Sequence, residues 1–278
     1  MSGSDAAPHH ASTVRSADGT TIAYERAGSG PPMILIDGAL CHRKLGQTAG
    51  LAALLAEHFT VFTYDRRGRG DSGDTAPYSV EREVEDVAAI VEAAGGSAFV
   101  WGMSSGALLA FEAAKRVRGI ERVAGYEAPL IADRSRPTTA EDWTRIREAI
   151  AAGRRGAAVQ LFLRSVGVPA PVLAVMRLLP LWSKLKAIAH TLPYDGAIIE
   201  PHQHGTPPQR AEWSAVTIPA LVVAGGSSPD WMRNGNRALA DALPNGRYET
   251  LPGQTHNLRP AAHVGILTEF GRGAAEPR

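Results

Sequence analysis

Cysteine is almost absent from this 278-residue chain, which has only Cys41. A lone cysteine forms no intrachain disulfide, so a reducing compartment is expected. The first eleven residues are small and polar and lack the apolar run of a signal peptide. No apolar stretch approaches the roughly 20 residues that span a bilayer. These absences predict a cytoplasmic protein that does not associate with a membrane.

An excess of charge of one sign is also missing. The chain has 29 Lys and Arg against 28 Asp and Glu, a formal net charge of +1. Such a balance provides no general attraction for nucleic acid or an anionic membrane. We interpret the arginines at 66, 67, 69, 154 and 155 as parts of turns and solvated faces. The expected partner is a small molecule, and a homodimer is left open.

Cofactor-binding patterns are absent as well. No G-x-G-x-x-G follows an expected strand, and there is no G-x-x-x-x-G-K-[ST], so no nucleotide cofactor is expected. His202 and His204 offer two metal ligands without a third. A flexible loop flanked by prolines is the better interpretation, and no metal site is predicted.

What the sequence does contain is an alternation of short apolar runs with segments of helical period. Residues 33–36 are apolar throughout, which is typical of a strand buried on both faces. The alternation predicts an α/β fold with a mostly parallel central sheet covered by helices on both faces. The expected strands are 21–27, 33–36, 59–64, 98–102, 120–126, 218–224 and 247–251, and the helices between them are 45–58, 79–94, 105–118, 231–243 and 263–270.

Residues 131–215 break this alternation. Four helices are expected there, at 139–152, 155–165, 172–179 and 181–191, and no strand. We therefore predict a core formed by residues 12–130 and 216–271, with a helical cap inserted after the sixth strand. Residues 1–11 and 272–278 are expected to be flexible termini.

The most informative motif is GMSSG at residues 102–106. It lies between an expected strand and an expected helix, which is the setting that a nucleophile elbow requires. The glycines allow strand and helix to approach closely, so that the Ser104 hydroxyl projects above the carboxyl edge of the sheet. Ser104 is therefore the candidate nucleophile.

A serine nucleophile needs a base within hydrogen-bonding reach. His256 follows the last expected strand, in a loop that opens at the same sheet edge as Ser104. The other histidines considered, in the N-terminal tail and in the inserted region, lack this placement. His256 is the candidate base.

At this point the chain resembles the α/β-hydrolase fold family, in its capped form with a serine nucleophile. The matching segments are ILIDG at 34–38, YDRRGRGDS at 64–72, GMSSG at 102–106 and GQTH at 253–256. They occur in the expected order over about residues 20–270. The resemblance implies a catalytic triad in the order Ser, acid, His, with no cofactor. It also implies a structural role for Asp65, Arg66 and Arg67.

The resemblance implies an oxyanion hole made by two backbone N–H groups. Ser105, at the start of the helix behind the nucleophile, is one expected donor. The second comes from the loop after the first buried strand, where Ala39 is preferred and Leu40 comes next. Relatives commonly have His-Gly there, whereas this chain has Asp37-Gly38. We interpret Asp37 as an acceptor within the turn, although a carboxylate at this place could repel an oxyanion.

Two residues compete for the triad acid. In many relatives the acid follows the seventh strand, but Ser228 stands at that place and Asp230 comes two residues later. Glu127 instead ends the sixth strand, which resembles the acid position of one haloalkane dehalogenase subgroup. Dehalogenation itself is not expected, because those enzymes use an aspartate nucleophile. We prefer Glu127 and keep Asp230 as the alternative.

The expected activity is hydrolysis of an ester, thioester, lactone or related carbonyl bond through an acyl-enzyme. Apolar residues of the cap predict a cleft for a small apolar molecule, with Leu40, Met103 and Trp182 as candidate substrate-binding residues. The alternative is a non-hydrolytic enzyme of the same fold, such as a lyase, cyclase or acyltransferase of natural-product metabolism.

Overall fold

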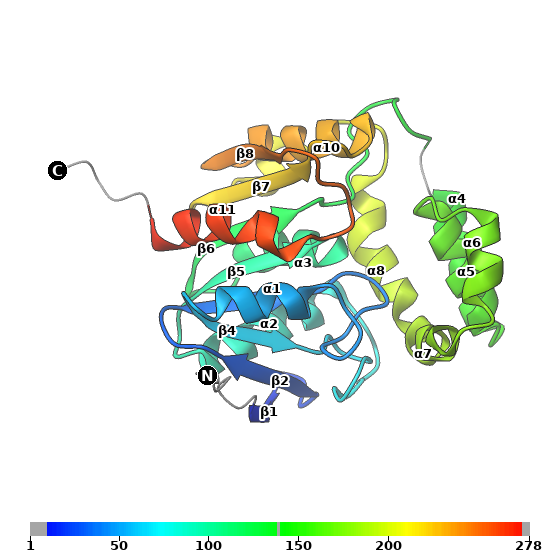
Figure 1. The fold of residues 1–278 in the computed structure, drawn as a ribbon, viewed down its shortest axis with the longest axis horizontal. Helices are drawn as coiled ribbons and strands as arrows, with labels where there is room; N and C mark the ends of the chain where they lie inside the picture. Colours follow the sequence, from blue (N-terminus) through cyan, green and yellow to red (C-terminus); the bar gives the residue numbers. More distant parts are fainter. Residues whose placement is uncertain (1–9, 138–139, 274–278) are drawn as a thin grey trace, which may run out of the picture.

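An eight-stranded sheet runs through the part of the chain that the computed structural model describes, residues 10–137 and 140–273 (Figure 1). Its order is β1-β2-β4-β3-β5-β6-β7-β8. The β1–β2 and β2–β4 pairs are antiparallel, and every later pair is parallel. The strands are β1 (His10–Arg15), β2 (Thr21–Ala27), β3 (Pro32–Ile36), β4 (Thr60–Tyr64), β5 (Ala98–Met103), β6 (Ile120–Tyr126), β7 (Ala220–Gly225) and β8 (Gly246–Leu251).

Helices cover both faces of this sheet, which confirms the predicted fold class. One face carries α1 and α11, which lie in front of the strands in Figure 1. The other carries α2, α3 and α10. The bounds of these helices are α1 (Thr48–Leu55), α2 (Val80–Ala93), α3 (Ser105–Ala114), α10 (Asp230–Ala242) and α11 (Pro260–Arg272).

The two-residue period of a strand explains how one short run contributes to two cores. In β3, Met33 and Leu35 face the layer of α1 and α11, whereas Ile34 and Ile36 face the layer of α2 and α3. All four side chains are buried. A central parallel strand must be apolar on both faces, and this is why the run lacks polar residues.

A helical segment separates β6 from β7 and stands beyond the carboxyl ends of the strands (Figure 1). No strand occurs in its described part, as expected. It contains α4 (Ala140–Ala151), α5 (Arg155–Ser165), α6 (Ala170–Met176), α7 (Pro180–Ile188), α8 (Leu192–Ile199) and α9 (Arg210–Trp213), with 3-10 turns at Ala189–Thr191 and Glu200–His202. Among the described residues, no helix combines the length and apolarity needed to cross a bilayer.

Three elements were not predicted. Strand β1 includes His10 and Ala11, which the sequence assigned to a flexible terminus. Its polar sequence lacks an apolar pattern because it pairs with β2 alone, at the edge of the sheet. Helices α8 and α9 were also missed. The α8 sequence contains a proline and a glycine, which favour turns over helix interiors.

Candidate active site

Ser104 lies on a sharp turn between β5 and α3. Its backbone angles are φ 56° and ψ −126°, a left-handed conformation that a side chain strains. Its N–H donates to the Tyr126 carbonyl (2.9 Å), and its own carbonyl accepts from Ala107 N–H (2.9 Å). The turn is thus held by the neighbouring strand and by the helix that follows it.

Two glycines permit this turn for a geometric reason. A Cβ on Gly102 would lie 2.0 Å from the Gly106 carbonyl oxygen, and one on Gly106 would lie 2.4 Å from the Ile36 carbonyl oxygen. Both contacts are with backbone, which cannot move aside. The glycines therefore let β5, α3 and the end of β3 meet around Ser104.

The loop after β3 lies against the nucleophile. A Cβ on Gly38 would come within 3.0 Å of the Ser104 Cβ. The Gly38 carbonyl accepts from Arg69 Nη1 (2.8 Å), and Leu40 has a left-handed φ of 56°. Ala39, between them, lines a cavity that also contains Ser104.

Glu127 follows β6 directly and is fully buried. Its φ of 51° makes it one of three described non-glycine residues with positive φ, together with Leu40 and Ser104. All three stand just beyond strand ends at one edge of the sheet. Strained backbone of this kind is concentrated at functional sites.

The Glu127 carboxylate holds His256. Oε2 accepts from His256 Nδ1 at 2.9 Å, while Oε1 accepts from Gly225 N–H at 2.8 Å and from the Ser228 hydroxyl. Burial raises the pKa of Glu127, but the bonds from His256, Ser228 and Gly225 outweigh it and bring the pKa below its usual range. The group is therefore an ionised carboxylate facing an imidazole.

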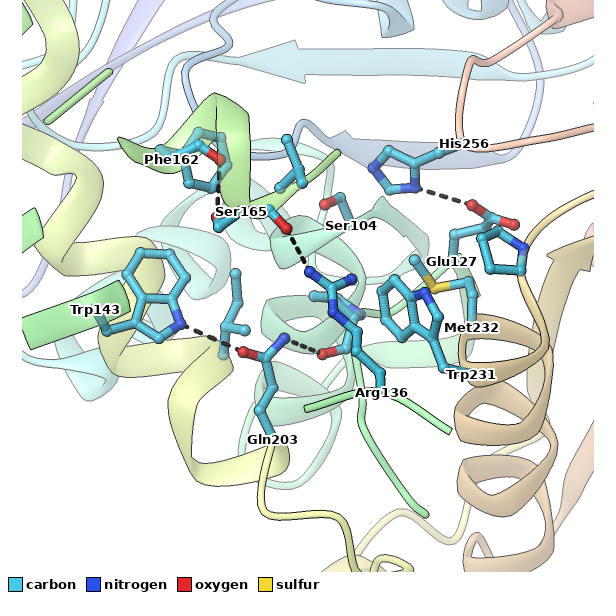
Figure 2. Close-up of a pocket in the computed structure, with 14 residues that line it drawn as sticks. Ser104, Glu127, Arg136, Trp143, Phe162, Ser165, Gln203, Trp231, Met232 and His256 are labelled. Carbon is cyan, nitrogen blue, oxygen red and sulfur yellow. Dashed lines mark hydrogen bonds and ion pairs between the residues drawn. The ribbon is translucent and has the colours of Figure 1, made fainter. Parts of the chain in front are cut away.

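His256 lies in the loop between β8 and α11, and this loop is anchored. Tyr126 donates its hydroxyl proton to the Thr255 carbonyl (2.5 Å), and Ser227 N–H donates to the Gln254 carbonyl (2.9 Å). Because Nδ1 is bound to Glu127, Nε2 is the ring nitrogen that remains for another partner. No direct hydrogen bond joins Ser104 and His256, but both line the same two cavities (Figure 2).

The two candidates for the acid are in different settings. Asp230 begins α10 with a side chain that is 75% exposed, and it pairs with Arg233. It does not contact His256. Ser228, at the position where many relatives have the acid, instead donates its hydroxyl to Glu127. The carboxylate beside the imidazole is thus that of Glu127.

Two cavities share Ser104 and His256 as lining residues, and their volumes are about 700 and 1150 Å³. Sheet loops and the helical segment both contribute to the smaller one (Figure 2). Met103 lines the larger one, as expected. Leu40 and Trp182 line neither and pack in the hydrophobic core. Lining residues that sequence reasoning missed include Arg136, Trp143, Phe162, Gln203, Trp231 and Met232.

A buried ionic network lies behind the nucleophile turn. Arg66 makes two bonds to Glu83 (2.6 and 2.7 Å) and one to Asp195 Oδ1 (2.8 Å). Arg69 binds the other Asp195 oxygen (2.7 Å). The Ser105 hydroxyl donates to Asp195 Oδ1 (2.8 Å). The Ser105 backbone N–H lies in the first turn of α3, where N–H groups have no acceptor within the helix.

Asp195 belongs to α8, so the network connects the helical segment to the sheet. All the side chains of Arg66, Arg69 and Asp195 are at most 1% exposed. Burial raises the pKa of Asp195, but the charges of Arg69 and Arg66 outweigh it, so that the pKa falls below its usual range. The structural role expected for Arg66 and Arg67 agrees with these contacts, because Arg67 likewise makes two bonds to buried Asp86. The interpretation of Arg66, Arg67 and Arg69 as solvated residues is wrong, because all three side chains are buried.

Asp37 is buried at the edge of the larger cavity. Oδ2 accepts from the Thr48 hydroxyl (2.5 Å), in line with the expected turn acceptor, and Oδ1 has no hydrogen-bond partner. Burial raises the pKa of Asp37 to about 6, although Thr48 and the charges of Arg69 and Arg66 oppose this. Asp37 therefore changes its charge near neutral pH.

One group of side chains away from this site has the residue types of a metal centre. Ligand atoms of Glu112, His202 and Glu212 lie within 4.8 Å of one another. However, Glu112 already accepts from Lys115 (2.6 Å) and Arg116 (3.3 Å). Of the two histidines noted in the sequence, His202 alone joins this group, and one of its two carboxylates is engaged by two cations.

Comparison with known proteins identifies the family of the chain. Residues 17–265 match the model of the alpha/beta hydrolase family. A solved alpha/beta hydrolase from Sphaerobacter thermophilus is 52% identical with a TM-score of 0.84, and the match covers 93% of this chain and 99% of that one. BpoC of Mycobacterium tuberculosis, named as a non-heme bromoperoxidase, is 27% identical over 84% of this chain and 90% of its own length.

A solved structure of lower sequence identity shares the fold. The enol-lactonase of Burkholderia xenovorans is 23% identical, with a TM-score of 0.62 over 95% of this chain and 97% of that one. This likeness concerns the fold. The resemblance first inferred from motifs at residues 34–38, 64–72, 102–106 and 253–256 is confirmed by the family match across the same region. The chain belongs to the alpha/beta hydrolase family.

Proposed function

We propose that the protein is a serine hydrolase that cleaves an ester, thioester, lactone or related carbonyl bond of a small molecule. The observation that carries this proposal is the bond between buried Glu127 and His256 Nδ1 in a cavity shared with Ser104. The candidate nucleophile, the candidate base and an oriented carboxylate therefore line one cavity. The relative named as an alpha/beta hydrolase, at 52% identity, supports the same reaction class.

In the proposed mechanism, His256 Nε2 removes the proton from the Ser104 hydroxyl as the oxygen attacks the carbonyl carbon. The backbone N–H groups of Ser105 and Ala39 donate to the developing oxyanion. The imidazolium then gives its proton to the leaving group, and the acyl group remains on Ser104. Water, activated by His256, releases the acid. Glu127 stabilises the imidazolium throughout without taking its proton.

The nucleophile is tested with a fluorophosphonate probe and p-nitrophenyl esters. Wild-type protein should form a covalent adduct at Ser104, located by peptide mass analysis, and should hydrolyse the esters. Ser104→Ala should lose both properties while keeping its fold by circular dichroism. Folded wild-type protein that is neither labelled nor active would disprove the proposal. Labelling without ester turnover would favour the non-hydrolytic alternative.

The acid is tested with a matched pair of charge-removing changes. Glu127→Gln should lower kcat by about 10³- to 10⁴-fold, because the amide neither stabilises the imidazolium nor fixes the tautomer. Asp230→Asn should stay within about twofold of wild type, because an exposed ion pair contributes little. The assignment fails if the Asp230 change is the damaging one.

A further inference from the structure

The smaller cavity contains a positive charge with which no carboxylate of the described residues forms an ion pair. Three of its lining side chains carry or acquire charge: Glu127, His256 and Arg136. Glu127 and His256 bind each other. Arg136 remains, half-buried in a wall that is otherwise neutral and largely apolar. A charge placed in such surroundings is costly unless something pairs with it.

The contacts of Arg136 hold its guanidinium in place without neutralising it. Nη2 donates to the Ser165 carbonyl, and the guanidinium carbon lies 4.2 Å from the centre of a Trp231 ring. Figure 2 shows the guanidinium directed towards Ser165, beside Trp231. Among the residues that the structure describes, no carboxylate forms an ion pair with it. Burial lowers the pKa of Arg136, which the charge of Asp142 opposes, yet an arginine stays protonated at neutral pH.

The form of the group indicates what it binds. A guanidinium offers five N–H donors in a plane, and only one nitrogen is engaged by Ser165. The remaining donors suit the two oxygens of a carboxylate. A phosphate dianion would leave one negative charge uncompensated in an apolar cavity, whereas a carboxylate matches the single cation. The stacking on Trp231 fixes the plane and so lowers the cost of binding.

We propose that Arg136 binds a free carboxylate on the substrate, at the end remote from the carbonyl that Ser104 attacks. The substrates are then half-esters or related acyl compounds with an apolar middle and an acidic end. This deepens the proposed function and rests on it. It also refines the sequence prediction of a small apolar molecule by adding a charged end.

The test compares p-nitrophenyl half-esters of succinic, glutaric and adipic acid with the neutral butyrate, pentanoate and hexanoate of equal acyl length. Wild-type protein should show a higher kcat/KM for the acid than for its neutral partner at one chain length at least. In Arg136→Gln that ratio should fall by about 10- to 100-fold, the range of a charged hydrogen bond. Arg134→Gln, an exposed arginine of the same loop, should keep the wild-type ratio.

Arg136→Met repeats the test with an uncharged side chain of similar reach, in case the glutamine variant does not fold. A structural role of Arg136 would lower both activities and leave the ratio unchanged. An unchanged ratio in a folded variant, or wild-type preference for the neutral ester at every length, overturns the proposal.

Binding without turnover separates this inference from the proposed function. Ser104→Ala should bind the monoamide of at least one of succinic, glutaric and adipic acid in calorimetry, and Ser104→Ala/Arg136→Gln should bind that monoamide about 10- to 100-fold more weakly. If the first binds and the second does not, the carboxylate site stands even where wild-type protein hydrolyses no ester. If ester hydrolysis is found but neither variant binds, the carboxylate site fails and the hydrolase remains.

Discussion

At the scale of single residues, the site depends on which group stands beside His256. Ser228 occupies the place where many relatives have the acid, and it supplies a hydrogen bond to Glu127 instead. The carboxylate beside His256 comes instead from Glu127 at the end of β6, whose backbone is left-handed (φ 51°). The hydroxyl of Ser228 and the N–H of Gly225 then stabilise the displaced charge. The Glu127 carboxylate, the Ser228 hydroxyl and the Gly225 N–H therefore form one hydrogen-bonded group.

Asp37 gives a prediction on pH and stability. Its pKa is raised to about 6 from an ordinary value of 3.8, so the folded chain binds this proton more tightly than the unfolded chain does. The resulting stability is complete below about pH 4 and is lost as the pH rises through 6. Asp37→Asn removes the titration. Its free energy of unfolding relative to wild type should therefore rise by about 2 to 3 kcal/mol between pH 4 and 7.

Urea titrations at fixed pH values across this range measure that difference. Asp241→Asn, an exposed change on α10, is the control and should show a constant difference from wild type. A constant difference for Asp37→Asn as well would contradict the prediction.

At the scale of elements, strands and helices of the core follow from the sequence because their signals are local. A strand buried on both faces is apolar throughout, as β3 is, and a covering helix such as α2 repeats its apolar residues every three or four positions. The GMSSG motif was recognisable for the same reason, since its strand and helix are adjacent in the chain. Edge strand β1 and helix α8 lack such signals.

The turn at Ser104 gives a prediction at this scale. Gly102→Ala places a Cβ 2.0 Å from the Gly106 carbonyl oxygen, so that β5 and α3 must separate. We expect the free energy of unfolding to fall by more than about 4 kcal/mol, together with loss of fluorophosphonate labelling. Gly265→Ala on α11 is the control, because its Cβ meets open space. It should raise stability by up to about 1 kcal/mol, and equal urea midpoints for the two variants would refute this account.

Other parts of the site had no local signal because they depend on contacts between distant segments. Asp195 meets Arg66 and Arg69 across 129 and 126 residues, and nothing near Asp195 in the sequence marks it as buried. Helical spacing predicts that Trp182 is covered but does not distinguish core from cavity. Arg136 lies outside regular structure, where periodicity gives no information. Residues of these kinds can be identified only from the folded structure.

At the scale of the whole molecule, the helical segment is joined to the sheet by charge as well as by apolar packing. Asp195→Asn would leave the guanidiniums of Arg66 and Arg69 without their shared carboxylate in a buried place. We expect a loss of about 3 to 5 kcal/mol in the free energy of unfolding. Thermal and urea unfolding measure it, with the exposed Glu148→Gln of α4 as the matched control. A loss no greater than that of the control would show that the network does not support the fold.

The position of Asp195 has a consequence for how this enzyme can diversify. The fixed end of the helical segment is α8, where the carboxylate is locked behind the nucleophile turn. Val166, which directly follows α5, borders both cavities and takes no part in the contacts of Asp195. We therefore expect changes of chain length and sequence there to alter which substrates fit the cavities, while Ser104, Glu127 and His256 keep their positions.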